Sequence, residues 1–287
     1  MLTDSIPAAI RYMLLSALGF ALMAACVKAV GGYGIPVMEI VAARAIISLI
    51  ISYVDVKRKR ISVWGNNKPL LIARGAIGAV SLMVIYFAVT TLPLAEATIL
   101  QYTYPAFTAV LALIFLKERI QLATIICIAL SILGLLVMMR PGIETETSAL
   151  PLLSVGAALL GALGSAAAYV IVRQLSRSED GSVIIFYFPL IALPASLILL
   201  GDDFVMPNTE ALILLIMVGI FTQVGQIGLT KAMAAESAGK ATAYSYVQVI
   251  FSAILGIIFF AETPTFWTLM GGGLIITGAL INALMKR

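Results

Sequence analysis

The stretch PLAEATILQYTYPAFTAVLALIFLKE, from Pro93 to Glu118, is an apolar segment that carries a proline, a polar stripe and a terminal acid. A second version of it, GKATAYSYVQVIFSAILGIIFFAE, runs from Gly239 to Glu262. A shift of 144 residues places Ala97, Thr98, Tyr102, Phe107 and Glu118 on Ala241, Thr242, Tyr246, Phe251 and Glu262. Self-similarity at a fixed spacing indicates that one structural unit occurs twice.

The composition is that of a membrane protein. Hydrophobic residues make up 62% of the 287 and charged residues 11%, with a mean hydropathy of +1.09, against about 45–50% and about 25% in soluble domains. A helix needs roughly 20 apolar residues to cross the bilayer, whereas barrel strands show short alternating segments. Ten long apolar runs lie near residues 9–30, 35–54, 69–91, 94–115, 121–139, 150–172, 183–200, 210–230, 239–260 and 266–284. We therefore predict an all-α integral membrane protein with ten transmembrane helices.

Lysines and arginines concentrate on one side of this arrangement. With the N-terminus inside, 15 of the 18, Arg74 among them, fall in cytoplasmic loops or helix ends, and Lys28, Arg44 and Arg140 fall on the other side. Basic residues favour the cytoplasmic face. We expect both termini in the cytoplasm and the inner (plasma) membrane of a prokaryote as the location. The net charge of +4 follows from this bias and indicates no nucleic-acid partner.

The repeat divides the chain into two five-helix units, which we place at residues 1–142 and 143–287. Because five is odd, the second unit enters the membrane upside down relative to the first. The loop charges agree, since Lys117-Glu118-Arg119 is basic whereas Ala261-Glu262-Thr263 has no basic residue. Inverted repeats can exchange conformations and open a central site to each side in turn. We expect two inverted repeats around a central cavity and transport by alternating access.

Several motifs of the chain resemble one family of transporters. They are PLAEAT at 93–98, a Tyr-Pro pair at 104–105, FLKER at 115–119, FFAETPTFW at 259–267 and GGGLIITG at 271–278. Over essentially the whole chain they are similar to the EamA family of the drug/metabolite transporter (DMT) superfamily. The resemblance implies that helices four, nine, three, eight, one and six surround the cavity, with helices five and ten at the periphery. It implies transport of a metabolite without naming the cargo.

Polar residues recur on one face of each copy of the repeated stretch. Thr98, Gln101, Pro105 and Thr108 follow one another at steps of three, four and three, which places them on one helix face. A polar stripe in hydrocarbon must face protein or water. Substrate binding is therefore predicted for Thr98, Gln101, Tyr104, Thr108, Thr242, Ser245, Gln248 and Ser252. The alternative is that these hydroxyls only bond to nearby carbonyls and hold helices together.

Pro105 is expected to kink its helix, because it removes the amide that would bond the Gln101 carbonyl. Val249 occupies the equivalent position in the second copy. We therefore expect the second copy to lack the kink caused by proline, and the binding site to be asymmetric.

Two further helices carry polar groups that could face the cavity. Gln223 and Gln226 lie on the eighth helix, and an amide that faces lipid would be costly. Ser165 and Tyr169 lie on the sixth helix and could also reach inward. We include all four among the substrate-binding candidates, although Tyr169 could instead be an interfacial residue.

Charged residues near the membrane are candidates for gating or coupling. Lys28, Glu39 and Arg44 lie in the outer part of the first two helices, where they form either an external gate with a proton-linked acid or a structural ion pair. Glu96 and Lys240 precede the repeated helices and are gate residues or helix-end charges. Glu118 and Glu262 are expected to cap or tether loops outside the cavity.

These observations predict a secondary transporter, exporting or exchanging a small polar or amphipathic metabolite such as an amino acid or an S-adenosylmethionine-like or vitamin-like compound. The alternative is a passive channel or scaffold with the same fold; a membrane enzyme is less favoured because the chain has no histidine. The chain has no GxxxxGK[ST] loop for binding ATP, so protons or a counter-substrate would supply the energy for transport. No cofactor or metal is expected, since cysteines at ligand spacing are absent too. A homodimer is compatible with the sequence.

Overall fold

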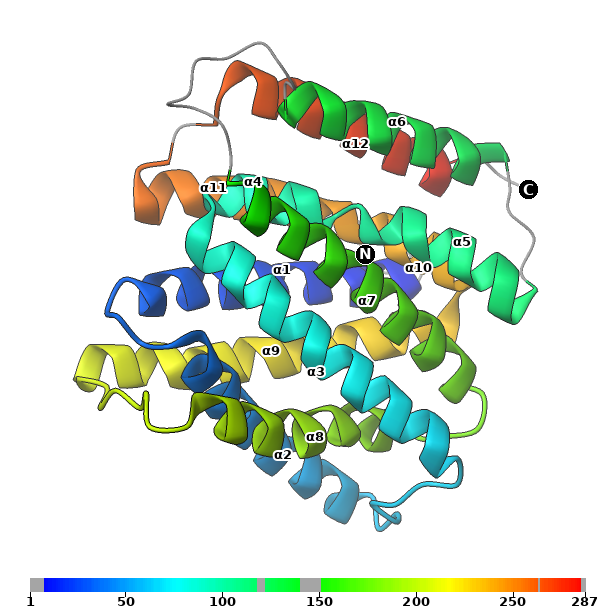
Figure 1. Cartoon of the computed structure of the whole chain (residues 1–287). Helices are drawn as coiled ribbons and strands as arrows, with labels where there is room; N and C mark the ends of the chain where they lie inside the picture. The colour runs from blue at the N-terminus through cyan, green and yellow to red at the C-terminus, as the bar shows by residue number, and fades with distance from the viewer. Residues whose placement is uncertain (1–7, 118–121, 140–150, 263, 285–287) are drawn as a thin grey trace, which may run out of the picture.

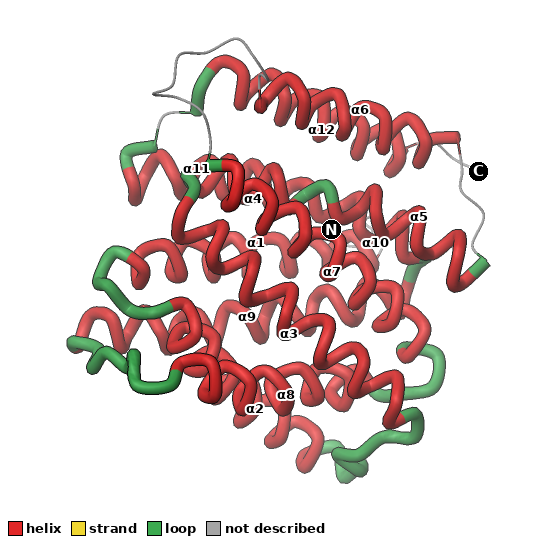
Figure 2. The backbone as a smooth tube through the Cα atoms, in the orientation of Figure 1, coloured by secondary structure: helices red, strands yellow, loops and turns green. Residues whose placement is uncertain are grey.

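The computed structural model of the chain describes residues 8–117, 122–139, 151–262 and 264–284. Within these ranges all regular elements are helical, as Figure 2 shows. The elements are α1 (Ala8–Gly31), α2 (Val37–Arg58), α3 (Lys68–Thr91), α4 (Leu94–Gln101), α5 (Tyr104–Leu116), α6 (Leu122–Met139), α7 (Leu152–Leu175), α8 (Gly181–Leu200), α9 (Thr209–Ala235), α10 (Ala238–Ala243), the 3₁₀ turn η1 (Tyr244–Tyr246), α11 (Val247–Phe260) and α12 (Phe266–Leu284). The prediction of an all-α protein is confirmed.

These elements make ten crossings of the bundle. The fourth crossing consists of α4 and α5, and the ninth consists of α10, η1 and α11. In the described ranges, seven helical segments are long and apolar enough to span a membrane, and shorter apolar helices make up the others. Large apolar side chains such as Phe115, Leu152 and Ile198 are mostly exposed on the outside of the bundle. Such a surface is suited to contact with lipid, because apolar side chains need no hydrogen bonds and the backbone groups are already bonded within each helix.

The helix contacts follow a two-fold pattern. When the two halves are exchanged, the contact of α1 with α9 becomes that of α7 with α3, and the contact of α3 with α8 becomes that of α9 with α2. The contacts of α2 with α8 and of α6 with α12 map onto themselves. Figure 1 shows α4 and α5 running opposite to α10 and α11, and α6 beside α12 at one edge of the bundle. The boundary that we expect between residues 142 and 143 lies outside the described residues.

Both copies of the repeated stretch are interrupted near their middle. In the first copy α4 ends at Gln101 and α5 begins at Tyr104, with Pro105 in its first turn, where a missing amide costs little. The second copy changes to a 3₁₀ turn between α10 and α11. The second copy therefore lacks the proline, but it is interrupted as well. The Ser245 hydroxyl donates to the Thr242 carbonyl at 2.6 Å. A side chain therefore bonds a backbone carbonyl at this break, which contains no proline.

Glycines allow α1 and α9 to approach closely. A Cβ atom on Gly19 would lie 2.8 Å from the Gly225 amide nitrogen, and one on Gly228 would lie 2.6 Å from the Tyr12 carbonyl oxygen. In both cases the neighbour is backbone, which cannot move aside cheaply. Small residues serve this purpose at membrane helix interfaces. The pairing of α1 with α9 therefore depends on these positions.

We predict that Gly228→Ala lowers the stability of the purified protein in detergent by about 1–3 kcal/mol, because the added methyl group overpacks the interface. Gly156→Ala is the matched control, since a Cβ atom there meets no atom within 4 Å. Thermal unfolding of both variants measures the effect. Equal melting temperatures for the two variants would show that the close approach of α1 and α9 does not matter for stability.

Candidate functional site

A cavity lies at the centre of the bundle, where three clusters of buried apolar residues meet. Its volume is about 70 Å³, which is room for several water molecules at roughly 10–15 Å³ each. The wall includes residues of α1, α3, the two interrupted crossings, α7 and α9, together with Arg44 of α2 and Phe188 of α8. The cavity therefore sits between the two halves of the chain and beside both helix breaks.

Hydrogen bonds join the two interrupted crossings across this cavity. The Tyr102 hydroxyl donates to Gln248 Oε1 at 2.5 Å. The Tyr104 hydroxyl bonds Ser245 Oγ, which in turn donates to the Thr242 carbonyl. The Tyr102–Gln248 and Tyr104–Ser245 bonds each take one partner from each copy of the repeat. Polar groups of the two breaks thus satisfy one another at the middle of the bundle.

Three tyrosines form an aromatic cluster on this wall. The ring centroid of Tyr104 lies 5.2 Å from that of Tyr102 and 5.1 Å from that of Tyr169. The rings are tilted or edge-on, which is the favoured arrangement for aromatic pairs. All three side chains line the cavity, so one wall offers apolar ring surface together with hydroxyl groups.

Arg44 lines the cavity from α2 and is only 2% exposed. Its Nη1 donates to the Tyr86 hydroxyl at 3.1 Å, and its guanidinium carbon lies 4.8 Å from the Phe188 ring centroid. Arg44 is the eighth residue of α2, which places it roughly 10 Å along the helix from Val37 at 1.5 Å per residue. The structure therefore puts it at the central cavity, and not at the outer interface where we expected a gate.

Arg74 lines the same cavity from α3 and is also 2% exposed. Its Nη2 donates to Gln226 Oε1 at 3.2 Å, and its guanidinium carbon lies 5.1 Å from the Phe188 centroid. We had counted this residue among the cytoplasmic charges, and the structure corrects that count. With Arg74 and Arg44 removed, 14 basic residues still oppose 2, so the direction of the charge bias is unchanged.

The cavity is electropositive. Because both guanidinium carbons lie near the centroid of one ring, they are at most about 10 Å apart. At that distance two positive charges repel by about 1.7 kcal/mol or more at an effective dielectric constant near 20. None of the described residues that line the cavity is acidic. The fold therefore holds two cations together at a site without a carboxylate of its own.

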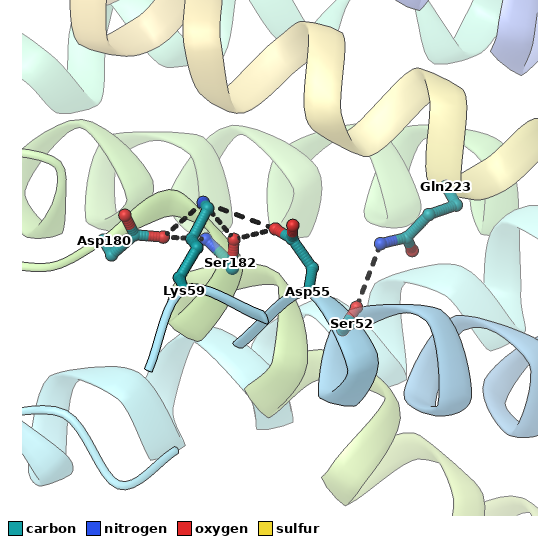
Figure 3. A network of polar contacts seen from close by, with 6 residues as sticks. All are labelled: Ser52, Asp55, Lys59, Asp180, Ser182 and Gln223. Carbon is teal, nitrogen blue, oxygen red and sulfur yellow. Dashed lines mark hydrogen bonds and ion pairs between the residues drawn. The ribbon is translucent and has the colours of Figure 1, made fainter. Parts of the chain in front are cut away.

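The predicted substrate-binding residues fall into two groups. Those that line the cavity are Gln101, Tyr104, Ser165, Tyr169, Gln226, Ser245 and Gln248. The structure places Thr98, Thr108, Thr242, Gln223 and Ser252 behind this wall. The three threonine hydroxyls donate to carbonyls four residues back, which is the local bonding that we considered as the alternative. Gln223 donates from Nε2 to Ser52 Oγ at 3.0 Å, as Figure 3 shows.

At one end of the bundle, Lys28 pairs with Glu262. The Lys28 Nζ lies 2.9 Å from Glu262 Oε1 and also donates to the Leu92 carbonyl at 2.8 Å. Glu262 Oε2 accepts from the Leu94 amide at 2.9 Å. These contacts join α1 and the start of α4 to the end of α11. Glu262 thus tethers the two halves at a place outside the cavity.

Of the remaining charged candidates, the structure describes the side chain of Glu39 alone. Glu39 is buried, and its Oε2 accepts from the Val205 amide at 3.0 Å, so it holds the connection between α8 and α9. Glu96 and Lys240 lie in α4 and α10, but their side chains lie outside the described part of the chain. Glu118 lies outside the described residues as well.

At the opposite end of the bundle, a polar network joins α2 to α8 (Figure 3). Lys59 Nζ lies 2.9 Å from Asp180 Oδ1 and 3.3 Å from Asp55 Oδ2, and it donates to Ser182 Oγ at 2.6 Å. Desolvation raises the pKa of Asp180, but hydrogen bonds from Ser182 and Lys59 outweigh it and lower the pKa below its usual value. Desolvation lowers the pKa of Lys59, but the two aspartates outweigh it and raise that pKa. The network therefore stays charged near neutral pH.

Arg74, Tyr86, Tyr102 and Phe188 are among the cavity-lining residues that sequence reasoning missed. Arg74 stands inside an apolar run, and a charge in that position marks a functional site by default. Tyr102 recurs as Tyr246 in the second copy, which was a signal as well. Tyr86 and Phe188 carry no sequence signal, because aromatic residues are common in membrane helices.

Comparison with known proteins identifies relatives over the whole chain. The EamA-like transporter family matches twice, at residues 7–140 and 152–284. The pseudopaline exporter CntI of Pseudomonas aeruginosa is 30% identical over all of both chains. Solute carrier family 35 member G1 of Homo sapiens is 30% identical over 96% of this chain and 78% of the human protein. A solved crystal structure covers 98% of each chain with a TM-score of 0.74 at 19% identity, and so supports the fold alone.

We predict that Tyr102 and Gln248 are energetically coupled. A double-mutant cycle with Tyr102→Phe and Gln248→Leu should give a coupling of about 0.5–2 kcal/mol in unfolding experiments, because either single change already removes the buried hydrogen bond that the two side chains share. The control cycle is Tyr33→Phe with Glu210→Ala, which removes an exposed hydrogen bond of 2.7 Å. A coupling no larger than in this control would mean that the bond between the two breaks contributes nothing.

Proposed function

The chain belongs to the EamA-like transporter family and is an integral membrane transporter, and on this premise we propose that it moves a small polar metabolite across the membrane by alternating access. The observation that carries the proposal is the placement of the cavity. It lies between two halves with opposite chain direction, beside an interrupted helix of each half. Inverted repeats with interrupted helices at a central site are a recurring design of secondary transporters.

The contacts at the two ends of the bundle support this mechanism. Lys28 and Glu262 join the halves at one end, and Lys59 with Asp180 joins them at the other. Access from one side requires that the contacts at that end break while those at the other end persist. We place the Lys28 end outside and the Lys59 end in the cytoplasm, because basic residues concentrate on the Lys59 side.

The finer features of the proposal follow from the same premise. We take residues 1–142 and 143–287 as the two moving units, with both termini in the cytoplasm of a prokaryote and the chain in its inner membrane. Export is the favoured direction, because the pseudopaline exporter is similar over its full length. Exchange against a counter-substrate or protons would supply the energy, and Glu39, a carboxylate that is buried among the described residues, is the candidate for coupling to protons.

We predict saturable and counterflow-stimulated uptake when the purified protein is reconstituted in liposomes. A carrier binds one substrate per cycle, so substrate loaded on the far side accelerates entry of a labelled compound. The assay uses a panel of labelled amino acids, organic acids and vitamins, with protein-free liposomes as the control. Flux that rises linearly with concentration and ignores internal substrate would indicate a channel, and the absence of any flux above the control would contradict transport.

We predict that Glu262→Gln opens the outer end of the bundle. The amide keeps an acceptor oxygen for Leu94 but loses the charge that attracts Lys28. A loss of about 1 kcal/mol shifts a two-state population roughly 5-fold. In a chain without native cysteines, a cysteine at position 23, on the cavity wall, should therefore react about 5-fold faster with an impermeant thiol reagent added outside.

The control for this experiment is Glu210→Gln, which removes the same charge from an exposed residue at the same end whose partner is the neutral Tyr33 hydroxyl. It should leave the reaction rate unchanged. An equal rate in Glu262→Gln and the unsubstituted chain, or an increase only when the reagent reaches the inner side, would contradict the role of the Lys28–Glu262 pair.

A further inference from the structure

The two buried arginines have donors that the protein does not use. Among the described residues, no hydrogen-bond partner reaches Nε of Arg44, or Nε and Nη1 of Arg74. Both side chains are 98% buried and both line the cavity. A buried charge without a counter-charge is costly, and native proteins keep such groups where they serve a ligand. The unused donors therefore point to a missing acceptor.

The chemistry of the guanidinium group narrows the choice of acceptor. Its planar fork of N–H groups matches the two oxygens of a carboxylate, and it stays charged at every physiological pH. The protein partners that are present are neutral, namely the Tyr86 hydroxyl and the Gln226 amide. Each engages one donor of its arginine and leaves the positive charge uncompensated. An anion is the ligand that would complete both sites.

Phe188 and Gly78 hold the two guanidinium groups in place without neutralising them. Both arginines lie over the Phe188 ring, where cation–π attraction fixes their position but leaves their N–H edges free. A Cβ atom on Gly78 would lie 3.0 Å from Nη1 of Arg74 and 2.9 Å from Cδ2 of Phe188. The glycine thus provides the space in which Arg74 and the ring meet.

We propose that the transported substrate is a small organic anion, bound through a carboxylate at Arg44 and Arg74, with its remaining skeleton against the rings of Tyr102, Tyr104 and Tyr169. The inference rests on the proposed function and names its substrate class. Dicarboxylates bind more tightly than monocarboxylates, because two negative charges neutralise both guanidinium groups. Neutral and cationic metabolites of similar size are excluded by the same unpaired charges.

Ligand-induced thermal stabilisation of the purified protein in detergent tests this class without requiring transport. The probes are succinate, malate and citrate, compared with acetate, with the neutral diamide of succinate, with the cation putrescine and with glycerol 3-phosphate. We expect stabilisation by the di- and tricarboxylates, weaker stabilisation by acetate and none by the diamide or putrescine. Stronger binding of the phosphate ester than of every carboxylate would contradict the carboxylate assignment.

Variants then locate the binding site. Arg44→Gln and Arg74→Gln should each raise the Kd for the best acid about 10- to 100-fold, as expected for loss of charge-assisted hydrogen bonds. Gly78→Ala keeps both charges but displaces Arg74, and should weaken binding as well. Lys231→Gln, an equal charge change at an exposed residue of α9, should leave the Kd unchanged.

The melting temperature of the ligand-free variants separates a binding role from a purely structural one. If the arginines serve a ligand, Arg74→Gln melts within a few degrees of the unsubstituted protein, because an uncompensated charge is removed. A large loss of stability with unchanged acid binding would overturn the proposal, as would the absence of binding by every acid tested. Acid binding that depends on the arginines, without flux in liposomes, would instead contradict the proposed transport.

Discussion

A backbone group without a hydrogen bond is hardly tolerated in hydrocarbon, so a membrane helix can be interrupted only where protein or water replaces the lost bonds. Both interruptions in this chain meet that condition beside the central cavity. The Thr103 hydroxyl donates to the Leu100 carbonyl at 2.9 Å in the first copy, and Ser245 donates to Thr242 in the second. The bond between Tyr104 and Ser245 then joins the two breaks. The position of the cavity follows from where these bonds can be made.

The second constraint is the charge within that cavity. Three apolar clusters surround it, and both arginine side chains are only 2% exposed. Low polarity around a charge strengthens every interaction that the charge makes. Arg44 and Arg74 are thus poorly stabilised by the protein and strongly attractive to an anion. At the ends of the bundle, by contrast, Lys28 and Lys59 each meet a carboxylate of the other half. The charged residues that join the two halves are therefore paired, whereas Arg44 and Arg74 at the centre face no carboxylate among the residues that line the cavity.

The sequence predicted the architecture well and the site less well. Apolar runs and the repeat at Pro93 and Gly239 predicted the helices, because membrane helices depend on local composition and length. The interruption of the second copy was missed, because this copy has Val249 in place of the proline. A hydrogen bond from the Ser245 side chain to the backbone accompanies the break instead. Arg74 was counted with the cytoplasmic loops and helix ends, although it is the seventh residue of α3 and its long side chain lies inside the bundle. Which hydroxyls face the cavity depends on helix rotation, and a three- or four-residue spacing does not determine it.

In alternating access, relative motion of the two halves opens one cavity to each side of the membrane in turn. Distances measured by pulsed electron spin resonance between labels on the two halves report this motion. In a chain whose two cysteines are replaced, spin labels at the exposed positions of Tyr33 and Met206 report on the end that holds Lys28, and labels at Arg58 and Arg177 report on the end that holds Lys59. We predict that a bound substrate shifts the two distance distributions in opposite directions, one end widening as the other narrows. Distances that stay constant at both ends, or that widen together, would contradict alternating access.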